Sequence, residues 1–300
     1  MSLAQLVEWS ARTLEVAAVS FGHGTENAFD EAAWLVLWQL GLPLDTDLHD
    51  TSLARPTPDQ LTAVERLITR RITSRQPAAY LTGEAWLQGV PFFVDQRCIV
   101  PRSLIAGPLL SGGLDCWLAN DSGTVLDMCT GGASLAILAA MAWPGIVLDA
   151  CDLSATALEV AAINVARHGL QSRVRLQQGD GMRAATGRYD LVLCNPPYVN
   201  SASMAGLPAE YRAEPPLALA GGSDGMDFIR ALLRDAPARM QPGAALVLEI
   251  GNERNHFETA FPRLDAVWLE TSAGCDQVCV LTRSALATTA GTHLGRPERA

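Results

Sequence analysis

Hydrophobic residues recur at helical spacing in three segments near the start of the chain. The first covers residues 3–16, and the second covers residues 27–40, where a glycine and a proline follow. The third opens at Thr57-Pro58-Asp59-Gln60, in which threonine can cap a helix, proline suits its first turn and glutamine completes a capping box. The pattern predicts a small helical bundle over residues 1–80.

The pattern changes in residues 81–104, where short apolar pieces are separated by glycine and proline. Trp86-Leu87 precedes Gly89, and Phe92-Phe93-Val94 follows it, which predicts a β-hairpin that links the bundle to the rest of the chain. Arg102 lies near the end of this segment. It faces either an acidic group or solvent.

Residues 105–283 alternate between short strand-like apolar runs and longer helical ones. The predicted strands are residues 124–128, 146–151, 174–177, 191–194, 244–250, 266–270 and 277–282. Strands that alternate with helices predict an α/β domain with a mainly parallel sheet. The short gap between the last two strands predicts an antiparallel edge hairpin. Residues 284–300 are small and polar and are predicted to form a disordered tail.

Polar residues follow three successive strands of this predicted sheet. Asp152, Asp180 and Asn195 each stand at a strand end, and ligands of open α/β sheets bind at that edge. The first strand leads into Thr130-Gly131-Gly132, whose glycines let the backbone approach a ligand in front of a helix N-terminus. Asp152 lies 21 residues after Gly131, close to the spacing of a carboxylate that grips a ribose. The alternatives are a helix-start acid for Asp152 and a turn residue for Asp180.

The stretch Asn195-Pro196-Pro197-Tyr198 carries the most specific chemistry. Proline stiffens this strand exit and keeps Asn195 out of the helical region. The Asn195 side-chain carbonyl and the Pro196 carbonyl can together accept both hydrogens of a planar –NH2 group. Two such acceptors orient an amide or adenine nitrogen and favour the charge that builds up as it attacks. Tyr198 could stack on the planar substrate. The alternative is an ordinary proline-rich strand exit.

The composition and the net charge limit the kinds of partner that this chain is expected to bind. A net charge of −10 and a pI near 4.9 argue against a broad nucleic-acid groove and favour a small basic partner. The seven scattered cysteines predict buried, reduced thiols in a cytoplasmic protein, and the absence of Cys-x-x-Cys pairs argues against a metal site. His23 and His49 are predicted to be surface or capping residues. We expect neither a signal sequence nor a membrane-spanning segment.

Over residues 75–283 the chain resembles the HemK-like protein-glutamine methyltransferases. The matching stretches, in order, are Gln76-Pro77-Ala78-Ala79-Tyr80-Leu81-Thr82-Gly83, Val100-Pro101-Arg102-Ser103, Asp127 to Gly132 and Asn195-Pro196-Pro197-Tyr198. The resemblance implies a Rossmann-like class I S-adenosylmethionine-dependent methyltransferase fold with a seven-stranded sheet. It also implies that the N-terminal helical domain recognises the substrate.

The family also implies a role for each predicted site residue. The residues at the methionine end of the cofactor, S-adenosylmethionine, would be Asp127, Thr130, Gly131 and Gly132. Those at its ribose and adenine would be Asp152, Asp180 and Gly181, and Asn195-Pro196-Pro197-Tyr198 would hold the glutamine amide. The departure is Ala133, where the family usually has glycine. Its methyl group would crowd the cofactor if the backbone needs a positive φ or a close approach. We expect tolerance because Gly132 lies beside it.

Two features resemble the branch of this family that modifies the third protein of the large ribosomal subunit, rather than the branch that modifies peptide release factors. They are residues 207–215 and Cys129. We therefore predict methylation of a glutamine in that ribosomal protein, with the loop over residues 200–225 covering the acceptor. The rival hypotheses are release-factor methylation, adenine-N6 methylation of nucleic acid, and a weakly catalytic, cofactor-binding ribosome-assembly factor.

Overall fold

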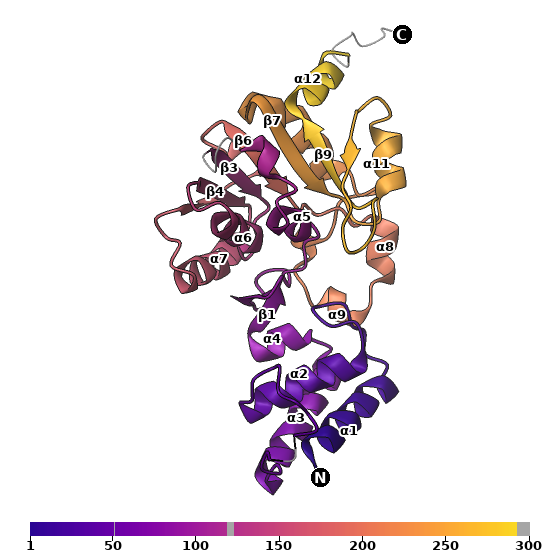
Figure 1. The fold of residues 1–300 in the computed structure, drawn as a ribbon. Helices are drawn as coiled ribbons and strands as arrows, with labels where there is room; N and C mark the ends of the chain where they lie inside the picture. Colours follow the sequence, from indigo (N-terminus) through magenta and orange to yellow (C-terminus); the bar gives the residue numbers. More distant parts are fainter. Residues whose placement is uncertain (51, 119–122, 293–300) are drawn as a thin grey trace.

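A computed structural model describes residues 1–50, 52–118 and 123–292, with side chains as far as residue 288. A helical bundle at the N-terminus is joined to a larger α/β part by a narrow segment that contains a hairpin (Figure 1). Among the described residues, every helix is too short or too polar to cross a membrane.

Three helices form the N-terminal bundle, and each begins where the sequence pattern predicts. They are α1 (Leu3–Val16), α2 (Ala28–Leu40) and α3 (Pro58–Ser74). Thr57 and Gln60 form the predicted capping box of α3. The apolar faces of the three helices pack around one cluster that includes Leu6, Leu35 and Ile68. A short helix, α4 (Ala78–Thr82), follows the bundle and was not predicted.

The predicted hairpin is present. β1 (Glu84–Leu87) and β2 (Val90–Phe93) pair antiparallel, with Gln88 and Gly89 at the turn. The chain then passes through residues 94–105 to the short helix α5 (Ala106–Leu110) and a 3-10 turn (Asp115–Trp117).

Seven strands form the central sheet in the order β5-β4-β3-β6-β7-β9-β8. Their bounds are β3 (Thr124–Met128), β4 (Val147–Asp152), β5 (Val174–Gln178), β6 (Tyr189–Cys194), β7 (Met240–Glu249), β8 (Val267–Trp268) and β9 (Val278–Thr282). β3 to β7 run parallel, and β9 pairs antiparallel with β7 and with β8. The predicted α/β class and its antiparallel edge hairpin are both confirmed.

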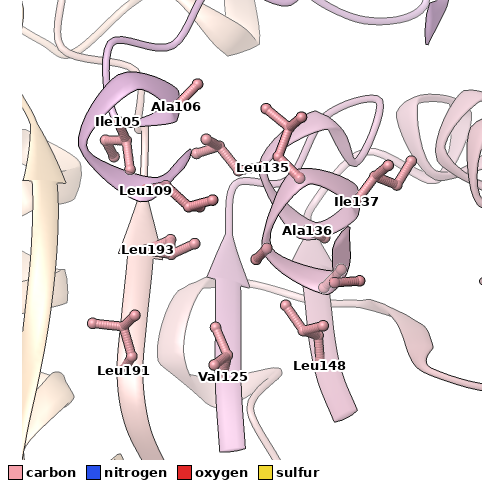
Figure 2. Close-up of a cluster of buried hydrophobic side chains, with 14 of the residues drawn as sticks. Ile105, Ala106, Leu109, Val125, Leu135, Ala136, Ile137, Leu148, Leu191 and Leu193 are labelled. Carbon is pink, nitrogen blue, oxygen red and sulfur yellow. The ribbon is translucent and has the colours of Figure 1, made fainter. Parts of the chain in front are cut away.

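Successive strand residues point to opposite faces of the sheet, and in the central strands both sets are apolar. Helices therefore cover both faces. Val125, Leu191 and Leu193 face α5 and the apolar helix α6 (Ser134–Ala142), as Figure 2 shows. The same apolar cluster takes in part of α7 (Ala155–Arg167). Leu126 and Val192 belong to a second cluster. That cluster includes side chains of α10 (Asp227–Asp235), the 3-10 turn Ala236–Arg239, α11 (Arg254–Ala260) and α12 (Arg283–Thr292).

Two segments differ from the predictions. The expected loop over residues 200–225 contains the short helices α8 (Ser201–Gly206) and α9 (Ala209–Arg212) and a 3-10 turn (Pro216–Ala218). The predicted disordered tail is wrong for residues 284–292, which belong to α12. Leu286 anchors that helix because its side chain is buried against the second cluster. The rest of the predicted tail, residues 293–300, lies outside the described residues.

Candidate active site

A cavity opens at the carboxyl edge of the sheet, where β3, β4 and β6 end. Its empty volume, which includes space open to solvent at its mouth, is about 1110 Å³. Residues 97–103, Pro215, Leu217 and Ala218 also line it. The cavity brings together the three polar residues predicted at strand ends, Asp152, Asp180 and Asn195. Asp127 of β3, which the family resemblance indicated, lines it as well.

Asp127 is buried next to the predicted glycine turn. Its Oδ2 accepts hydrogen bonds from the Thr130 hydroxyl at 2.5 Å and from the Ala136 N–H at 3.0 Å. Burial raises the pKa of its carboxyl to about 7. Among the described residues no arginine or histidine forms an ion pair with Asp127. A cationic ligand group in the cavity would therefore supply the counter-charge that this carboxylate lacks.

Asp152 joins the glycine turn to the next helix. Its Oδ2 accepts from the Gly131 N–H and its Oδ1 from the Ser154 N–H, each at 2.8 Å. A carboxylate can accept about four hydrogen bonds, so about two remain for ligand hydroxyls. Asp180 lies exposed at the rim of the cavity. The neighbouring Gly181 has a φ of +52°, and a side-chain carbon there would lie 3.8 Å from the Phe228 ring.

Ala133 adopts the backbone conformation that made its methyl group a concern. Its φ is +64°, in the left-handed region that favours glycine. The methyl group, however, is buried in the apolar cluster beneath α6. Gly131, Gly132 and Ser134 line the cavity, whereas Ala133 does not. The alanine therefore strains the backbone of the turn, but it leaves the space for a ligand unchanged.

Asn195 follows β6 directly, and its half-buried side chain lines the cavity. Within the described part of the chain, its carboxamide and the Pro196 carbonyl take part in no hydrogen bond. The contrast with Asn164 is clear, since that buried amide bonds the backbone of Phe93 at 2.7 and 3.0 Å and of Gly132 at 2.9 Å. Asn195 is therefore available to a ligand, whereas Asn164 joins the hairpin to the glycine turn.

Pro196 and Tyr198 lie beside the cavity and do not line it, in contrast to Asn195 and Pro197. Pro196 is buried. The Tyr198 hydroxyl donates a hydrogen bond to Glu249 Oε1 at 3.2 Å. Burial, together with the nearby Glu249 carboxylate, raises the pKa of this phenol far above its ordinary value. Tyr198 is therefore a neutral hydrogen-bond donor.

Glu214 is a site residue that the sequence did not indicate. Its fully buried carboxylate accepts both Nη groups of Arg102 at 2.7 Å and the Val100 N–H at 2.9 Å. Burial opposes ionisation, but Arg102 and His23 together lower the pKa of this carboxyl to about 2. Of the two possibilities for Arg102, the one that faces a carboxylate is therefore correct.

His23 corrects a prediction, because it is buried and not at the surface. Its Nε2 lies 3.4 Å from Glu214 Oε2, and its ring packs on Tyr211 at 4.3 Å. A lone histidine in a glycine-rich turn carries no sequence signal of burial. The residues that bury it, Tyr211 and Glu214, lie almost 190 residues further along the chain.

A second glutamate anchors the same segment to the bundle. Glu210 Oε1 lies 3.3 Å from Arg71 Nη1 and 3.0 Å from Arg75 Nη1. Arg71 is fully buried and also pairs with Glu31 at 2.8 Å. Although burial opposes ionisation, backbone hydrogen bonds and the two arginines lower the pKa of Glu210. Glu210 and Glu214 thus hold α9 against the bundle, where Figure 1 shows it.

Comparison with known proteins identifies the family. The model of the methyltransferase small domain matches residues 114–207. A ribosomal protein uL3 glutamine methyltransferase of Bordetella pertussis is 53% identical over 290 residues, which are 96% of this chain and 97% of that protein. Proteins of the same name from Burkholderia pseudomallei and Neisseria meningitidis serogroup B are 50% and 43% identical, and the matches cover 95% of this chain in both cases and 96% and 94% of those proteins. These matches confirm the resemblance seen in the motifs, including its ribosomal-protein branch, and the chain therefore belongs to the family of ribosomal protein uL3 glutamine methyltransferases.

Proposed function

We propose that this chain transfers a methyl group from S-adenosylmethionine to the side-chain amide nitrogen of a glutamine in ribosomal protein uL3. The relatives named for this activity align with nearly the whole chain. The observation that carries the proposal is the Asn195 carboxamide. It is free of hydrogen bonds to the described residues and lines the same cavity as the carboxylates of Asp127, Asp152 and Asp180.

The cavity suits the proposed cofactor. S-adenosylmethionine supplies an electrophilic methyl group on a positively charged sulfur. The residues that would hold its methionine end are Asp127, Thr130, Gly131 and Gly132, and those that would hold its ribose and adenine are Asp152, Asp180 and Gly181. The carboxylate of Asp127, which has no ion-pair partner among the described residues, suits a cationic group. Gly131, whose φ is +54°, puts no side chain into the turn.

Asn195 and Pro196 would act on the acceptor. An amide nitrogen is a poor nucleophile because its lone pair is delocalised. If the Asn195 side-chain carbonyl and the Pro196 carbonyl accept both of its hydrogens, the nitrogen is held in one direction and the positive charge that develops on it is stabilised. Groups that stabilise developing charge in this way contribute roughly 100- to 1000-fold in rate. Pro197 and Tyr198 would keep the loop in place.

In this proposal each part of the chain has its own role. Residues 1–80 recognise the substrate, residues 81–104 form the linker, and residues 105–283 carry out the transfer. The net charge of −10 suits a basic ribosomal protein of the large subunit and opposes a direct nucleic-acid groove. In this proposal the enzyme acts on its ribosomal substrate in the cytoplasm, without a membrane partner.

The test uses ribosomal proteins from cells that lack this enzyme. They are incubated with the purified chain and labelled S-adenosylmethionine, and the label is mapped by mass spectrometry. We expect one methylated glutamine in uL3. Asn195→Ala should reduce the rate at least about 100-fold, while Asn255→Ala, an exposed asparagine on α11, should leave it unchanged.

The other outcomes identify the rival functions. Label in a release factor would keep the chemistry and replace the substrate. Label in nucleic acid, with strong dependence on salt, would indicate an adenine methyltransferase. Cofactor binding without any transfer would indicate an assembly factor.

A further inference from the structure

Glu249, the last residue of β7, has a buried carboxylate that no step described above uses. Its Oε2 accepts from the Ser103 hydroxyl at 2.6 Å and from the Leu104 N–H at 2.9 Å. Its Oε1 accepts from the Tyr198 hydroxyl at 3.2 Å. All three partners donate, so the carboxylate satisfies the buried donors of two separate chain segments at once.

Sheet register places Glu249 next to the acceptor residues. Cys194 of β6 pairs with Leu248 of β7, so the next residues along the two strands are Asn195 and Glu249. Ser103 lines the same cavity as Asn195. The carboxylate thus stands between the segment that carries Ser103 and the loop that carries Asn195.

Two glycines, Gly225 and Gly251, pack closely against Tyr198. A side-chain carbon at Gly251, where φ is +52°, would lie 2.5 Å from Tyr198 Cε2. One at Gly225, where φ is +79°, would lie 2.2 Å from the Tyr198 carbonyl oxygen. Two glycines therefore let the chain close around this residue, and the bond to Glu249 fixes the far end of its side chain.

We propose that Glu249 is a positioning residue for methyl transfer, acting through the hydroxyl of Tyr198. By fixing Tyr198 it fixes the loop that begins at Asn195, and so the direction in which the Asn195 and Pro196 carbonyls point. This inference rests on the proposed function for its rate effect. Tyr198 does not line the cavity, so in this proposal it acts through the loop.

The chemistry of the pair agrees with this role. Among the described residues, Glu249 has no basic side chain in hydrogen-bond contact, because the nearby Arg102 is occupied by Glu214. Burial raises the pKa of Glu249, while the donors around it oppose that effect. A misplacement of about 1 Å in the reacting groups costs roughly 100-fold in rate. Loss of this carboxylate is therefore expected to reduce turnover strongly.

A double-mutant cycle tests the coupling. We expect Glu249→Ala to lower kcat about 100-fold and Tyr198→Phe to lower it about tenfold. If Glu249 acts through Tyr198, the double variant should be no slower than Glu249→Ala alone. Glu249→Gln keeps the shape and an acceptor oxygen, and it should recover most of the rate. The dissociation constant of S-adenosylmethionine should stay within about twofold in all of them, which separates loss of position from loss of folding.

Hydrogen exchange gives a readout that does not depend on the substrate. The N–H groups of Val199 and Ser201 are bonded to Leu219 and Gly222, and they report on the loop. They should exchange at least about tenfold faster in Tyr198→Phe and Glu249→Ala, with no change in residues 125–133. Tyr189→Phe is the matched control, because Tyr189 donates to the Asp149 carboxylate at 2.6 Å from the far end of β6.

The inference is overturned if the two rate losses multiply in the double variant, or if loop exchange does not change. Should the wild-type chain transfer no methyl group to uL3, the proposed function fails and the exchange experiment alone decides on Glu249. The two failures are therefore distinguishable.

Discussion

Replacing Glu214 by glutamine is expected to destabilise the folded protein by about 3 kcal/mol at neutral pH. The magnitude follows from the carboxyl's folded-state pKa of about 2 against its ordinary value of 4.5, since each pKa unit corresponds to about 1.4 kcal/mol. The side chain is fully buried, so little solvent screening reduces this value. Glutamine keeps one acceptor oxygen but turns an N–H group toward Arg102, which leaves part of the guanidinium unpaired.

The sign of the pH dependence follows from the direction of the shift. A carboxyl whose pKa is lowered by folding contributes its full stability above its unfolded pKa of about 4.5. That contribution disappears as the pH falls from 4.5 towards 2. The difference between wild type and Glu214→Gln should therefore be constant from pH 7 to about pH 5 and shrink at lower pH.

Urea unfolding, followed by tryptophan fluorescence at a series of pH values, measures this difference. Glu159→Gln is the matched control. Glu159 also pairs with an arginine, Arg97, at 2.8 Å, but its side chain is 61% exposed. An exposed pair is worth at most about 1 kcal/mol, so this variant should unfold almost as wild type does.

Two results would refute this reasoning. If Glu214→Gln costs no more than Glu159→Gln, the buried pair with Arg102 does not stabilise the fold. If the cost is large but the same at pH 7 and pH 3, it comes from altered packing and not from the ionised carboxylate.

Two further predictions concern the cofactor half of the site. The affinity for S-adenosylmethionine should increase about tenfold between pH 6 and pH 8, because Asp127 ionises with a pKa of about 7 and a cationic ligand favours its ionised form. Calorimetry at a series of pH values measures this affinity, and in Asp127→Asn it should not depend on pH. If the affinity of Asp127→Asn rises with pH as in the wild type, the assignment to Asp127 is wrong. Ala133→Gly should change the free energy of unfolding by less than about 1 kcal/mol. Glycine adopts the left-handed conformation of this position without strain, which stabilises the fold. The loss of a buried methyl group and the greater freedom of the unfolded chain oppose that gain. The cofactor affinity of this variant should stay within about twofold, and a tenfold gain would show that the methyl group crowds the ligand after all.

Local patterns were enough to predict the main elements of the fold. Apolar runs, capping residues and glycine turns depend on neighbours in sequence, so they placed the bundle, the hairpin and the order of strands and helices. The polar strand ends were equally readable, because parallel strands bring their carboxyl ends to one edge of a sheet. Asp152, Asp180 and Asn195 accordingly meet in one cavity.

The contacts that hold the acceptor side together could not be read in the same way. Arg102 and Glu214 are 112 residues apart, and Ser103 and Glu249 are 146 apart. Nothing in the local sequence pairs such residues, although a glutamate that ends the apolar strand β7 is a recognisable oddity. The helix α12 was missed for the same reason, since one leucine, Leu286, finds its apolar partner only in the folded sheet.

The way α9 docks onto the bundle has a consequence for how relatives of this protein could be recombined. A chimera that takes residues 1–80 from one relative and the remainder from another would separate Arg71, Arg75 and His23 from Glu210 and Glu214. Residues 207–215 would have to travel with the bundle to restore these pairs. Although the two segments lie far apart in the sequence, they form one structural unit, and we expect a change in one to require a matching change in the other.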